Sequence, residues 1–461
     1  MNRTKEQIYE ATAHAEAENK KNISRLSDRV LLTDYAYLTR ICEYGRVWTE
    51  ALQTALYEHE IVEIPTKKEP YYIDAPVIIP SNRRIEAWKA VIQLSPECRT
   101  LMFRNEHTFD GTYSPASPFE PDKNISIWGG CFAESQTERK GYGKSGRYSE
   151  SGNGFYGVST CMLFNNVDGL SLSNVTFRNT AGFALQAGDI RNAVFDNVWF
   201  DRCFADGLHI NGNSENILAR NIYGEVGDDL IALNAYDWQN SSVNFGPIRN
   251  VLCENLNLAP MSRYKALRFE PGIYTYADGS KVDCALENVV IKNVIGIRTF
   301  KMYLQTPPYD IGGKGESGEP GTIDNFFFED IKVDLRGPID AFSEYVHADA
   351  VRGVFAAFEL GANIVTLGFE NVELTHYKEE FPLSYLACIG PKSIVSGGKE
   401  IFDPYVNSRA EKLIFKNITV NGEKISDIRP LLREITFDNV NGDGDSSGNG
   451  KIINTEVTDL Q

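Results

Sequence analysis

The chain has 461 residues, a formal net charge of −17 at pH 7, 42% hydrophobic residues and 24% charged residues. This negative charge argues against nucleic acid and anionic membrane surfaces as partners. The hydrophobic content excludes a disordered chain, and no run approaches the roughly 20 apolar residues that a membrane-spanning helix needs. Single cores stop growing at roughly 250–300 residues, so the chain is either multidomain or built from stacked repeats.

Residues 1–43 are predicted to form a helical N-terminal extension. Their first stretch, MNRTKEQIYEATAHAEAENKKN, has no apolar core and no small-residue cleavage site, so no secretory signal is predicted and a cytoplasmic location is expected. The helical pattern continues to about residue 57, because WTEALQTALY places Trp48, Leu52 and Leu56 on one face.

A repeat of the form Asn/Asp–apolar–x–apolar runs through the centre of the chain. From Asn174 onward, successive copies start 23, 24, 34, 33, 42, 41 and 46 residues apart. Such units cannot close their own cores and must stack on one another. A period near 23 with several strands per unit is typical of a parallel β-helix, in which Asn side chains can form ladders at the turns. The copies begin at Asn124, Asn174, Asn197, Asn221, Asn255, Asn288, Asp330, Asn371 and Asn417.

We therefore predict an all-β, right-handed parallel β-helix over residues 44–440, followed by a tail at 441–461 that contains one potential strand. The Leu-x-x-Leu-x-Leu pattern of leucine-rich repeats is missing, and the regular tight hairpins of a propeller do not recur. Two polar, Gly-rich segments, 133–156 and 306–321, are predicted to be long loops that narrow a groove. The first of them could also join a second subunit in a homo-oligomer.

Three acidic residues stand out in the stretch FADGLHINGNSENILARNIYGEVGDDLIALN, which covers 204–234. Asp228 and Asp229 follow Asp206 by 22 and 23 residues, so stacked coils should bring the three together. Like charges raise one another's pKa, which favours a protonated carboxyl beside ionised ones. In a regular strand Asp228 and Asp229 would face opposite sides, so they share a site only if the chain turns at Gly227. Capping of ordinary turns by aspartate is the alternative explanation.

These motifs resemble those of the polygalacturonase family, glycoside hydrolase family 28, and of the wider pectin-lyase-like β-helix superfamily. FADGLHI is similar to the family's N-T-D-G motif at Asp206, VGDDLIAL to its double-Asp motif, and ALRFE to its G-x-R-I-K motif at Arg268. The resemblance implies an inverting glycosidase with Asp228 as general acid and with Asp206 and Asp229 as bases that position water. The Gly-His-Gly motif has no counterpart, and Glu270 replaces the family's lysine. Both differences argue against a standard polygalacturonase acting on a uronic acid.

Residues close to these motifs are expected to bind the sugar. His209 follows Asp206 by three residues, in a position where some members of the family carry histidine. Glu270 shares a strand face with Arg268 and could accept hydrogen bonds from sugar hydroxyls. The remaining candidate substrate-binding residues are Lys265, Tyr303, Gln305 and Tyr309.

No cofactor or metal is expected, because the chain has no zinc-binding pattern and no phosphate-binding loop. The eight cysteines show no CxxC motif and no paired spacing, which indicates mostly buried free thiols. The interpretation is a glycoside hydrolase that trims plant or microbial oligosaccharides from a chain end. Two alternatives use the same scaffold: a polysaccharide lyase or a fructan- or uronate-processing transferase, and a non-catalytic carbohydrate-binding β-helix. Calcium held by the three aspartates, with Arg268 as base, would suit the lyase.

Overall fold

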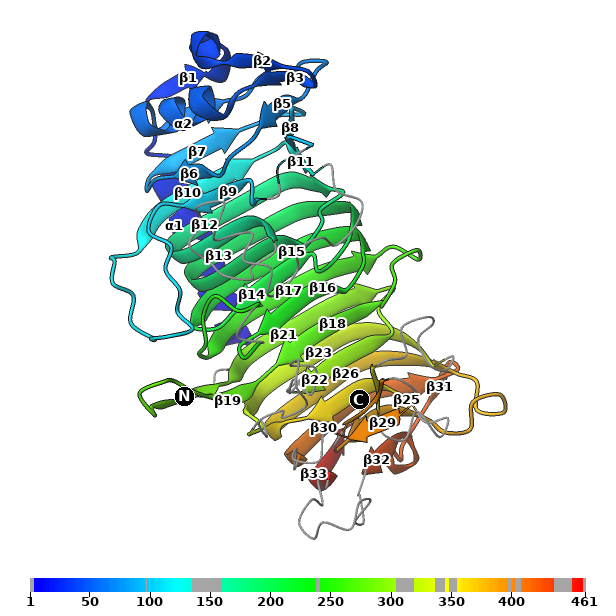
Figure 1. Cartoon of the computed structure of the whole chain (residues 1–461). Coiled ribbons are helices and arrows are strands. Elements are labelled where there is room, and N and C mark those ends of the chain that lie inside the picture. The colour runs from blue at the N-terminus through cyan, green and yellow to red at the C-terminus, as the bar shows by residue number, and fades with distance from the viewer. Residues whose placement is uncertain are drawn as a thin grey trace.

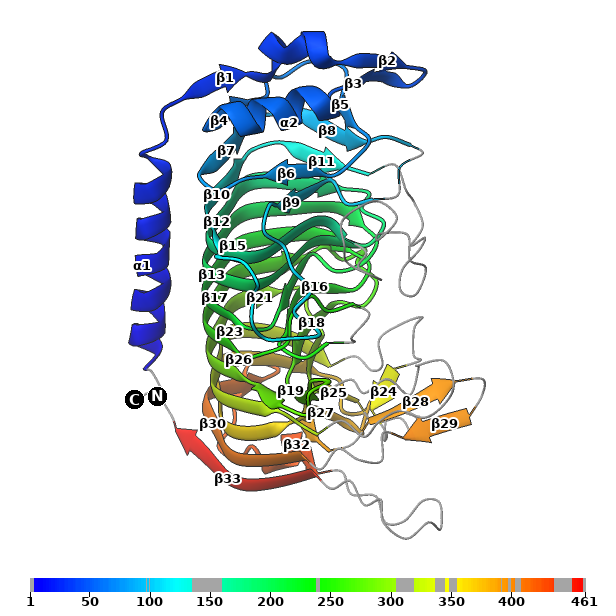
Figure 2. The same ribbon diagram turned by 60° about the vertical axis from the view of Figure 1, so that its left-hand side comes forward.

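The computed structural model describes residues 4–96, 98, 100–134, 160–237, 241–303, 319–335, 345–347, 355–390, 392–396, 399–402, 408–434 and 450–458. These residues form an elongated solenoid whose coils stack along one axis around a continuous hydrophobic core, as Figures 1 and 2 show. Successive coils pair through parallel strands of one large sheet. The predicted right-handed parallel β-helix is confirmed.

The elements follow one another along the solenoid in chain order (Figure 1). The helices among the described residues are α1 (Lys5–Ile23), α2 (Thr49–Glu58) and the 3-10 helices η1 (Leu32–Leu38) and η3 (Arg429–Leu431). The large sheet contains β1 (Arg29–Leu31), β2 (Arg40–Cys42), β3 (Gly45–Val47), β4 (Ile61–Glu63), β5 (Tyr71–Ile73), β6 (Val77–Ile79), β7 (Arg83–Glu86), β8 (Val91–Leu94), β9 (Phe103–Asn105), β10 (Asp122–Trp128), β11 (Cys131–Ala133), β12 (Thr160–Arg178), β13 (Phe183–Cys203), β14 (Leu208–Asn211), β15 (Ser214–Val226), β16 (Asp229–Asn234), β17 (Ile248–Leu258), β18 (Ala266–Glu270), β21 (Leu286–Ile295), β22 (Thr299–Tyr303), β23 (Thr322–Leu335), β25 (Phe355–Gly361), β26 (Asn363–His376), β27 (Ser384–Ile389), β30 (Ser408–Val420), β31 (Glu423–Lys424), β32 (Leu432–Glu434) and β33 (Gly450–Thr458). Two small antiparallel sheets consist of β19 (Gly272–Thr275) with β20 (Lys281–Cys284), and of β24 (Tyr345–His347), β28 (Lys392–Ser396) and β29 (Lys399–Phe402).

The coils turn at asparagines in the left-handed conformation, such as Asn174 (φ 59°) and Asn197 (φ 56°). Asparagine tolerates this conformation because its short polar side chain can hydrogen-bond locally. The side chains then bond from coil to coil, and Nδ2 of Asn197 donates to Oδ1 of Asn174 at 2.6 Å. The predicted asparagine ladders are therefore present.

The asparagines belong to two separate columns, which corrects two copies of the predicted repeat: Asn124 and Asn288 belong to the second column. Asn255 is continued by Asn293, whose Nδ2 lies 2.7 Å from Oδ1 of Asn255. Asn288 belongs to the second column, where it accepts a hydrogen bond of 2.7 Å from Asn325. The β19–β20 hairpin lengthens this coil, and the similar runs Asn-Val-Val and Asn-Val-Ile made the two columns indistinguishable by spacing.

The core repeats from coil to coil in the same register as the strands. Parallel pairing aligns equivalent buried positions, and aromatic rings stack where several of these positions are phenylalanine. The rings of Phe369 and Phe415, for example, lie 5.0 Å apart with an angle of 5° between their planes. One such column consists of Leu172, Phe195, Ala219, Cys253, Ile291, Phe328, Phe369 and Phe415.

The predicted continuous helix at the N-terminus is wrong between α1 and α2. β1 pairs in parallel with β4, and β2 forms an antiparallel hairpin with β3. Gly45 in this hairpin has φ +141°, and a Cβ there would lie 2.8 Å from the ring of Tyr72, so the turn requires glycine. The β-helix begins within residues that we predicted to be helical extension.

α1 lies along one side of the solenoid, parallel to its axis (Figure 2). Ile8 is fully buried and packs in a cluster with Val194, Leu218, Leu252 and Val290, which come from successive coils. Polar contacts flank this cluster: Nζ of Lys5 lies 2.5 Å from both Glu329 and Glu370, Arg220 pairs with Glu16 at 2.7 Å, and Asn19 donates to the carbonyl of Asn192 at 2.6 Å. The helix thus contacts coils from both halves of the β-helix.

Other predictions about the periphery have mixed outcomes. The segment 441–461 contributes β33, which pairs in parallel with β30 and is part of the β-helix. All eight cysteines are free thiols, five of them buried, as predicted. Most of the two predicted long loops, 133–156 and 306–321, lies outside the described residues.

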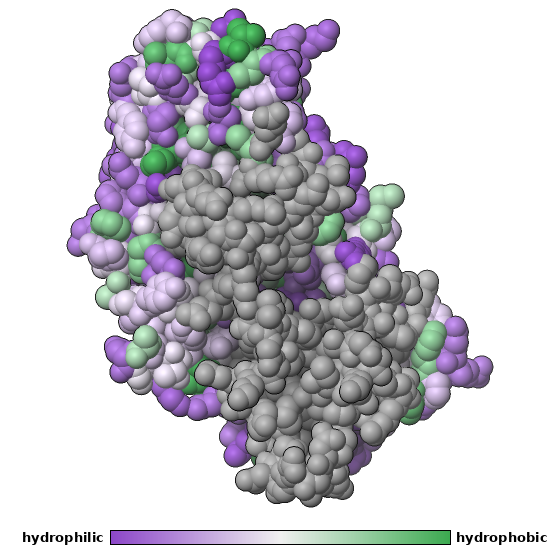
Figure 3. Space-filling view, viewed as in Figure 1, coloured by the Kyte–Doolittle hydropathy of each residue, from purple (hydrophilic) through white to green (hydrophobic). Residues whose placement is uncertain are grey.

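The surface of the described residues is largely polar. None of their helices is long and apolar enough to cross a membrane. In Figure 3, hydrophobic residues stand among hydrophilic ones at the end of the solenoid that carries the N-terminal elements. The large exposed side chains of this end include Tyr37 and Ile41.

We predict that Ile8→Ala destabilises the docking of α1. Removing the buried side chain should cost about 2–5 kcal/mol, because the cavity faces four coils that cannot all collapse into it. Hydrogen exchange of the α1 amides would measure the loss. Glu10→Ala, on the exposed face of the same helix, is the matched control. Equal protection in the two variants would contradict a stabilising role for this cluster.

Candidate active site

One face of the solenoid is built from short strands that carry outward-facing polar side chains. Its strands are the first part of β13 and then β14, β16, β18, β22 and β25, paired side by side. Because side chains alternate along a strand, two columns of side chains face outward, one on each side of a column of apolar side chains that faces inward. We call this surface the site face. Its first outward column consists of Gln186, His209, Ala232, Arg268, Lys301 and Glu359.

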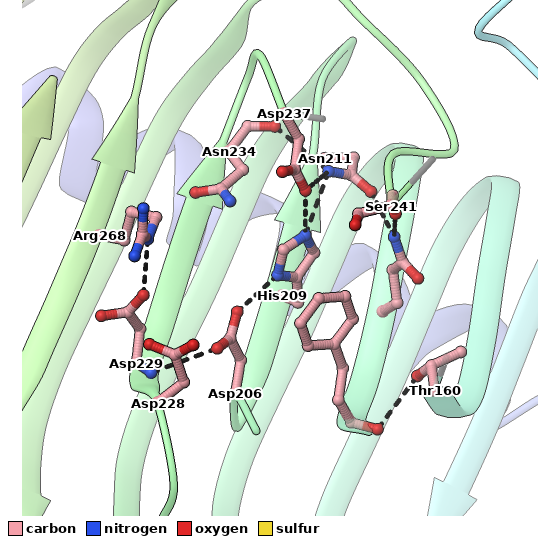
Figure 4. Close-up of polar contacts among 12 residues, drawn as sticks. Thr160, Asp206, His209, Asn211, Asp228, Asp229, Asn234, Asp237, Ser241 and Arg268 are labelled. Carbon is pink, nitrogen blue, oxygen red and sulfur yellow. Dashed lines mark hydrogen bonds and ion pairs between the residues drawn. The ribbon is translucent and has the colours of Figure 1, made fainter. Parts of the chain in front are cut away.

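The three predicted aspartates meet at one edge of the site face. Asp206 lies in the turn before β14, Asp228 in the bend before β16, and Asp229 is the first residue of β16. One carboxylate oxygen from each lies within 4.8 Å of the others. Figure 4 shows the three side chains facing one another. The stacking predicted from the spacing of 22 and 23 residues is therefore present.

A sharp bend lets neighbouring aspartates share one side of the chain. The bend falls at Gly227 and Asp228, directly before β16 begins. A Cβ on Gly227 would lie 1.9 Å from the carbonyl oxygen of Phe204, so this close approach of two coils requires glycine. The turn that we predicted at Gly227 is confirmed.

Asp229 is held ionised by two cations. Nε of Arg268 donates to its Oδ2 at 2.7 Å, and Nζ of Lys301 donates to its Oδ1 at 2.9 Å. Burial alone would raise the pKa of Asp229, but the two cations outweigh burial and lower that pKa to about 2. This carboxylate therefore stays charged throughout the neutral and mildly acidic range.

Asp228 has the opposite electrostatic environment. Burial and the charge of Asp229 raise its pKa to about 6, and only Lys301, at 3.6 Å, opposes them closely. Its side chain is 23% exposed, whereas that of Asp229 is 1% exposed. Between about pH 2 and pH 6 the two adjacent carboxyl groups thus differ in protonation, and Asp228, which is protonated in this range, is also the more accessible.

His209 connects Asp206 to a further carboxylate. Its Nδ1 lies 2.6 Å from Oδ2 of Asp206, and its Nε2 lies 2.8 Å from Oδ2 of Asp237 in the segment after β16 (Figure 4). The ring of Phe183 stacks on the imidazole at 3.9 Å. Burial lowers the pKa of His209, but the two hydrogen-bonded carboxylates outweigh it and raise the pKa to about 9.

The other predicted binding residues occupy different positions. Glu270 is buried on β18, with Oε2 3.7 Å from Arg268. Tyr303 is buried at the end of β22, and burial raises its pKa well above the ordinary value. Lys265 forms the left-handed turn before β18, and within the described part of the chain its side chain makes no hydrogen bond or ion pair. Gln305 and Tyr309 lie outside the described residues.

Two residues of the site were not predicted from the sequence: Lys301, which binds Asp229, and Asp237, which binds His209. Lys301 was visible in principle, because the site face repeats a five-residue pattern: ALQAG, GLHIN, LIALN, ALRFE, TFKMY and AFELG. Aligning ALRFE with TFKMY places Lys301 beside Arg268, which matches the observed register. Asp237 had no such signal, because it lies in an irregular segment rather than on a strand.

The spacing of the aspartates would allow a metal ion, but the oxygens of Asp206 and Asp229 already accept hydrogen bonds. Asp229 accepts from two cations, and Asp206 accepts from His209 and from the backbone N–H of Asp229 at 3.2 Å. A second acidic group, Glu106, His107 and Asp122, is bound internally in a similar way, with His107 Nδ1 2.8 Å from Asp122. Both arrangements resemble charge networks rather than oxygen cages for a divalent cation.

The site face is covered on its N-terminal side by the segment 241–246. Nε2 of Gln186 donates to the carbonyl of Ser241 at 2.7 Å, Asn165 hydrogen-bonds Asn244, and Leu163 packs with Val243. Gln186, Asn165 and Leu163 are buried. Arg268, in contrast, retains 12% side-chain exposure, and Glu359 is partly exposed. The accessible part of the site face therefore ends, on the N-terminal side, one strand away from His209.

The sequence matches no protein-family model and no curated protein. Solved β-helix glycoside hydrolases are similar in architecture. The family 28 exopolygalacturonase of Yersinia enterocolitica is 14% identical, with 93% of this chain and 78% of that chain covered and a TM-score of 0.44. A hyperthermoactive exopolygalacturonase from Thermotoga maritima is 10% identical, with 89% and 97% covered and a TM-score of 0.43.

A third similar structure is the catalytic domain of a family 87 α-1,3-glucanase in complex with nigerose. It is 13% identical with a TM-score of 0.40, and 81% of this chain aligns to 62% of that chain. The chain thus spans less than two thirds of that domain. Similarity at this level assigns neither a family nor a substrate to this chain, so the predicted membership of family 28 remains a prediction.

We predict that Lys301→Met destabilises the protein in a pH-dependent way. Removing one cation from the buried carboxylate of Asp229 should cost about 3–5 kcal/mol near neutral pH. A lowered pKa contributes stability above the unfolded value of 3.8, and this contribution is lost as the pH falls through about 2. The deficit in the free energy of unfolding should therefore shrink between about pH 4 and pH 2 in denaturant titrations.

Lys332→Met is the matched control, because Lys332 pairs with Glu373 on the surface and is 69% exposed. Exposed pairs contribute about 0–1 kcal/mol, so this variant should unfold almost like the wild type. Equal losses in the two variants, or a deficit independent of pH, would show that Lys301 does not stabilise an ionised Asp229.

Proposed function

We propose that the protein is a glycoside hydrolase whose catalytic groups are Asp206, Asp228 and Asp229. The observation that carries this proposal is the meeting of the three carboxyl groups within 4.8 Å, where two cations bind Asp229 closely and Asp228 lies farther from Lys301. These surroundings shift the two pKa values in opposite directions, to about 2 for Asp229 and about 6 for Asp228. Hydrolysis of a glycosidic bond needs one protonated carboxyl and one carboxylate on the same substrate. Environments that separate the pKa values of neighbouring groups are typical of acid–base pairs.

The catalytic roles of the three aspartates follow from these environments. Asp228, the most exposed of the three, donates its proton to the leaving glycosidic oxygen as the C–O bond breaks. Asp206 and Asp229 hold a water molecule, which attacks the anomeric carbon and gives its proton to one of them. Each of their oxygens has a second lone pair for this water beside its present donor.

The stereochemical course tests this arrangement. The nearest aspartate oxygens lie within 4.8 Å, closer than the roughly 6.5–9.5 Å typical of inverting pairs and nearer the about 5–5.5 Å of retaining ones. We nevertheless propose inversion, because cations engage both oxygens of Asp229, which makes it a poor nucleophile towards carbon. The anomeric configuration of the first product, read by proton NMR, decides the matter. Retention would overturn the assignment of Asp206 and Asp229 as bases.

Hydrolysis suits this site better than β-elimination. A lyase needs a residue that removes a proton from carbon, and Arg268 was the candidate. Although burial lowers the pKa of Arg268, the charge of Asp229 and other nearby acids raise it well above the ordinary value. A guanidinium that is paired at 2.7 Å with a buried carboxylate does not become a base near neutral pH.

We further propose that the enzyme acts at the end of a saccharide chain. The segment 241–246 covers the site face beside His209, so a sugar chain cannot continue over β13 and β12. Towards β22 and β25 the face carries charges of both signs, Lys301 and Glu359, that could bind further sugar units. Cleavage of a long oligosaccharide should therefore release one short product from the outset, which chromatography of early time points would detect.

The first experiment compares wild type with Asp228→Asn on pectic, fructan, arabinan and glucan oligosaccharides. Loss of the general acid should lower kcat by about 10²–10⁴-fold on the substrate that the wild type cleaves. Asp427→Asn, at a surface carboxylate 49% exposed, is the control and should retain full activity. New reducing ends without an unsaturated, ultraviolet-absorbing product identify a hydrolase.

Each other outcome points elsewhere. An unsaturated product would replace the hydrolase by a lyase, and transfer of a sugar to another saccharide would indicate a transferase. Turnover that survives Asp228→Asn would remove the aspartates from the mechanism. Binding without turnover on every saccharide would favour the non-catalytic β-helix.

The pH dependence follows from the protonation state of the general acid. Asp228 must be protonated, so kcat/KM should fall as the pH rises above about 6, by about tenfold per unit. On the acid side, activity should persist well below pH 4, because the pKa of Asp229 is about 2. A profile that rises between pH 6 and pH 8 would contradict the roles assigned to these residues.

A further inference from the structure

His209 lies between two carboxylates and is itself buried. The residue is 1% exposed, and Nδ1 and Nε2 face Asp206 and Asp237 at 2.6 Å and 2.8 Å. A neutral imidazole carries one N–H and could donate to only one of them. The other contact would then set a nitrogen lone pair against a carboxylate. Only the doubly protonated ring satisfies both partners.

The hydrogen bonds around Asp237 support this protonation state. Oδ1 of Asn211 accepts from Nε2 of Gln186 at 2.7 Å and from the backbone N–H of Val243 at 3.3 Å. This fixes the amide so that Nδ2 of Asn211 faces Asp237 at 3.4 Å and lies 3.3 Å from Nε2 of His209. Because Nδ2 is itself a donor, it does not accept the Nε2 proton of His209, which points to the same oxygen of Asp237.

Among the described residues, the imidazolium is the cation that hydrogen-bonds Asp206. Phe183 of β13 covers one ring face, and the flanking positions of the site face are the uncharged Gln186 and Ala232. Arg268 lies one strand further on and binds Asp229. Asp228 and Asp229, which meet Asp206 at this edge, are both acidic.

We propose that His209 is a positioning residue, charged near neutral pH, that fixes the orientation of Asp206, and that Asp237 holds His209 in this state. This inference rests on the proposed function only for the role of Asp206 in catalysis. His209 was predicted to bind substrate. The geometry instead turns both of its nitrogens towards protein carboxylates, so it acts on the substrate through Asp206.

Nitrogen-15 NMR of the imidazole rings tests the charge without any substrate. His209 should show two protonated nitrogens near neutral pH and titrate near pH 9. His376 is an internal reference, because burial lowers its pKa below the ordinary value. A ring of His209 that carries a single proton near neutral pH would overturn the proposal, whatever the catalytic activity of the protein.

Asp237→Asn tests the part played by the second carboxylate. Loss of one counter-charge should lower the pKa of His209 by at least about one unit, a tenfold weaker affinity for the proton. Asp237→Glu should restore most of the shift. Asp278→Asn, in the exposed turn of the β19–β20 hairpin, is the control and should leave the titration unchanged. An unshifted His209 in Asp237→Asn would overturn the role of Asp237.

Kinetics then separate positioning from substrate binding. In Asp237→Asn, kcat should fall by about 10–100-fold while KM changes less than about twofold, and the acid limb of the pH profile should move upward. An increase of KM alone would instead assign His209 to substrate binding. If the protein hydrolyses no saccharide, the proposed function fails, but the NMR experiment still decides the charge of His209.

The charge of His209 should also affect the pH dependence of the free energy of unfolding. A group with a raised pKa contributes stability that is fully present below its unfolded value of 6.5 and is lost as the pH rises through about 9. Wild type should therefore lose stability across this window in denaturant titrations, and Asp237→Asn should lose less. Parallel stability curves for the two proteins would contradict a charged His209 in the folded state.

Discussion

The registration of one coil upon the next is the constraint on which the rest of this structure depends. Parallel pairing aligns each residue with its counterpart in the following coil, and left-handed asparagines joined by side-chain hydrogen bonds fix the corners. Once the register is set, every outward position of a strand joins a column of similar positions. The site face is one product of this rule, because Arg268 and Lys301 are neighbours only through the stacking of β18 and β22. A shift of one residue in either strand would move one of the cations into the core.

The site gathers several acidic residues where water is largely excluded, and its cations decide how each of them behaves. Asp229 receives two cations and remains charged, Asp206 receives the imidazole of His209, and Asp228 shares only Lys301 at a longer distance. The chemical difference between the three carboxyls therefore comes from their partners rather than from their own positions. The partners lie on different coils and different elements, so the protonation pattern depends on the assembled solenoid.

The sequence was informative about functional residues that belong to the repeat and uninformative about those that lie outside it. The spacing of Asp206 and Asp228 predicted their meeting, because one coil separates them, and Gly227 correctly indicated the bend. Asp237 could not be predicted, since it lies in an irregular segment whose path depends on packing against Phe245 and Tyr274. At the N-terminus, helical periodicity around Leu52 was extended too far upstream, where pairing of β1 with β4 overrides local propensity.

The position of α1 has a consequence for how the solenoid behaves as a whole. Stacked repeats normally interact only with their nearest neighbours, so their end coils can fray independently of the middle. α1 connects coils that are far apart along the axis, from the acidic pair Glu329 and Glu370 to the carbonyl of Asn192. Opening any one of these coils must disturb contacts that several others share. A one-dimensional array thereby gains long-range cooperativity, which keeps the distances between stacked carboxylates constant while an end of the solenoid fluctuates.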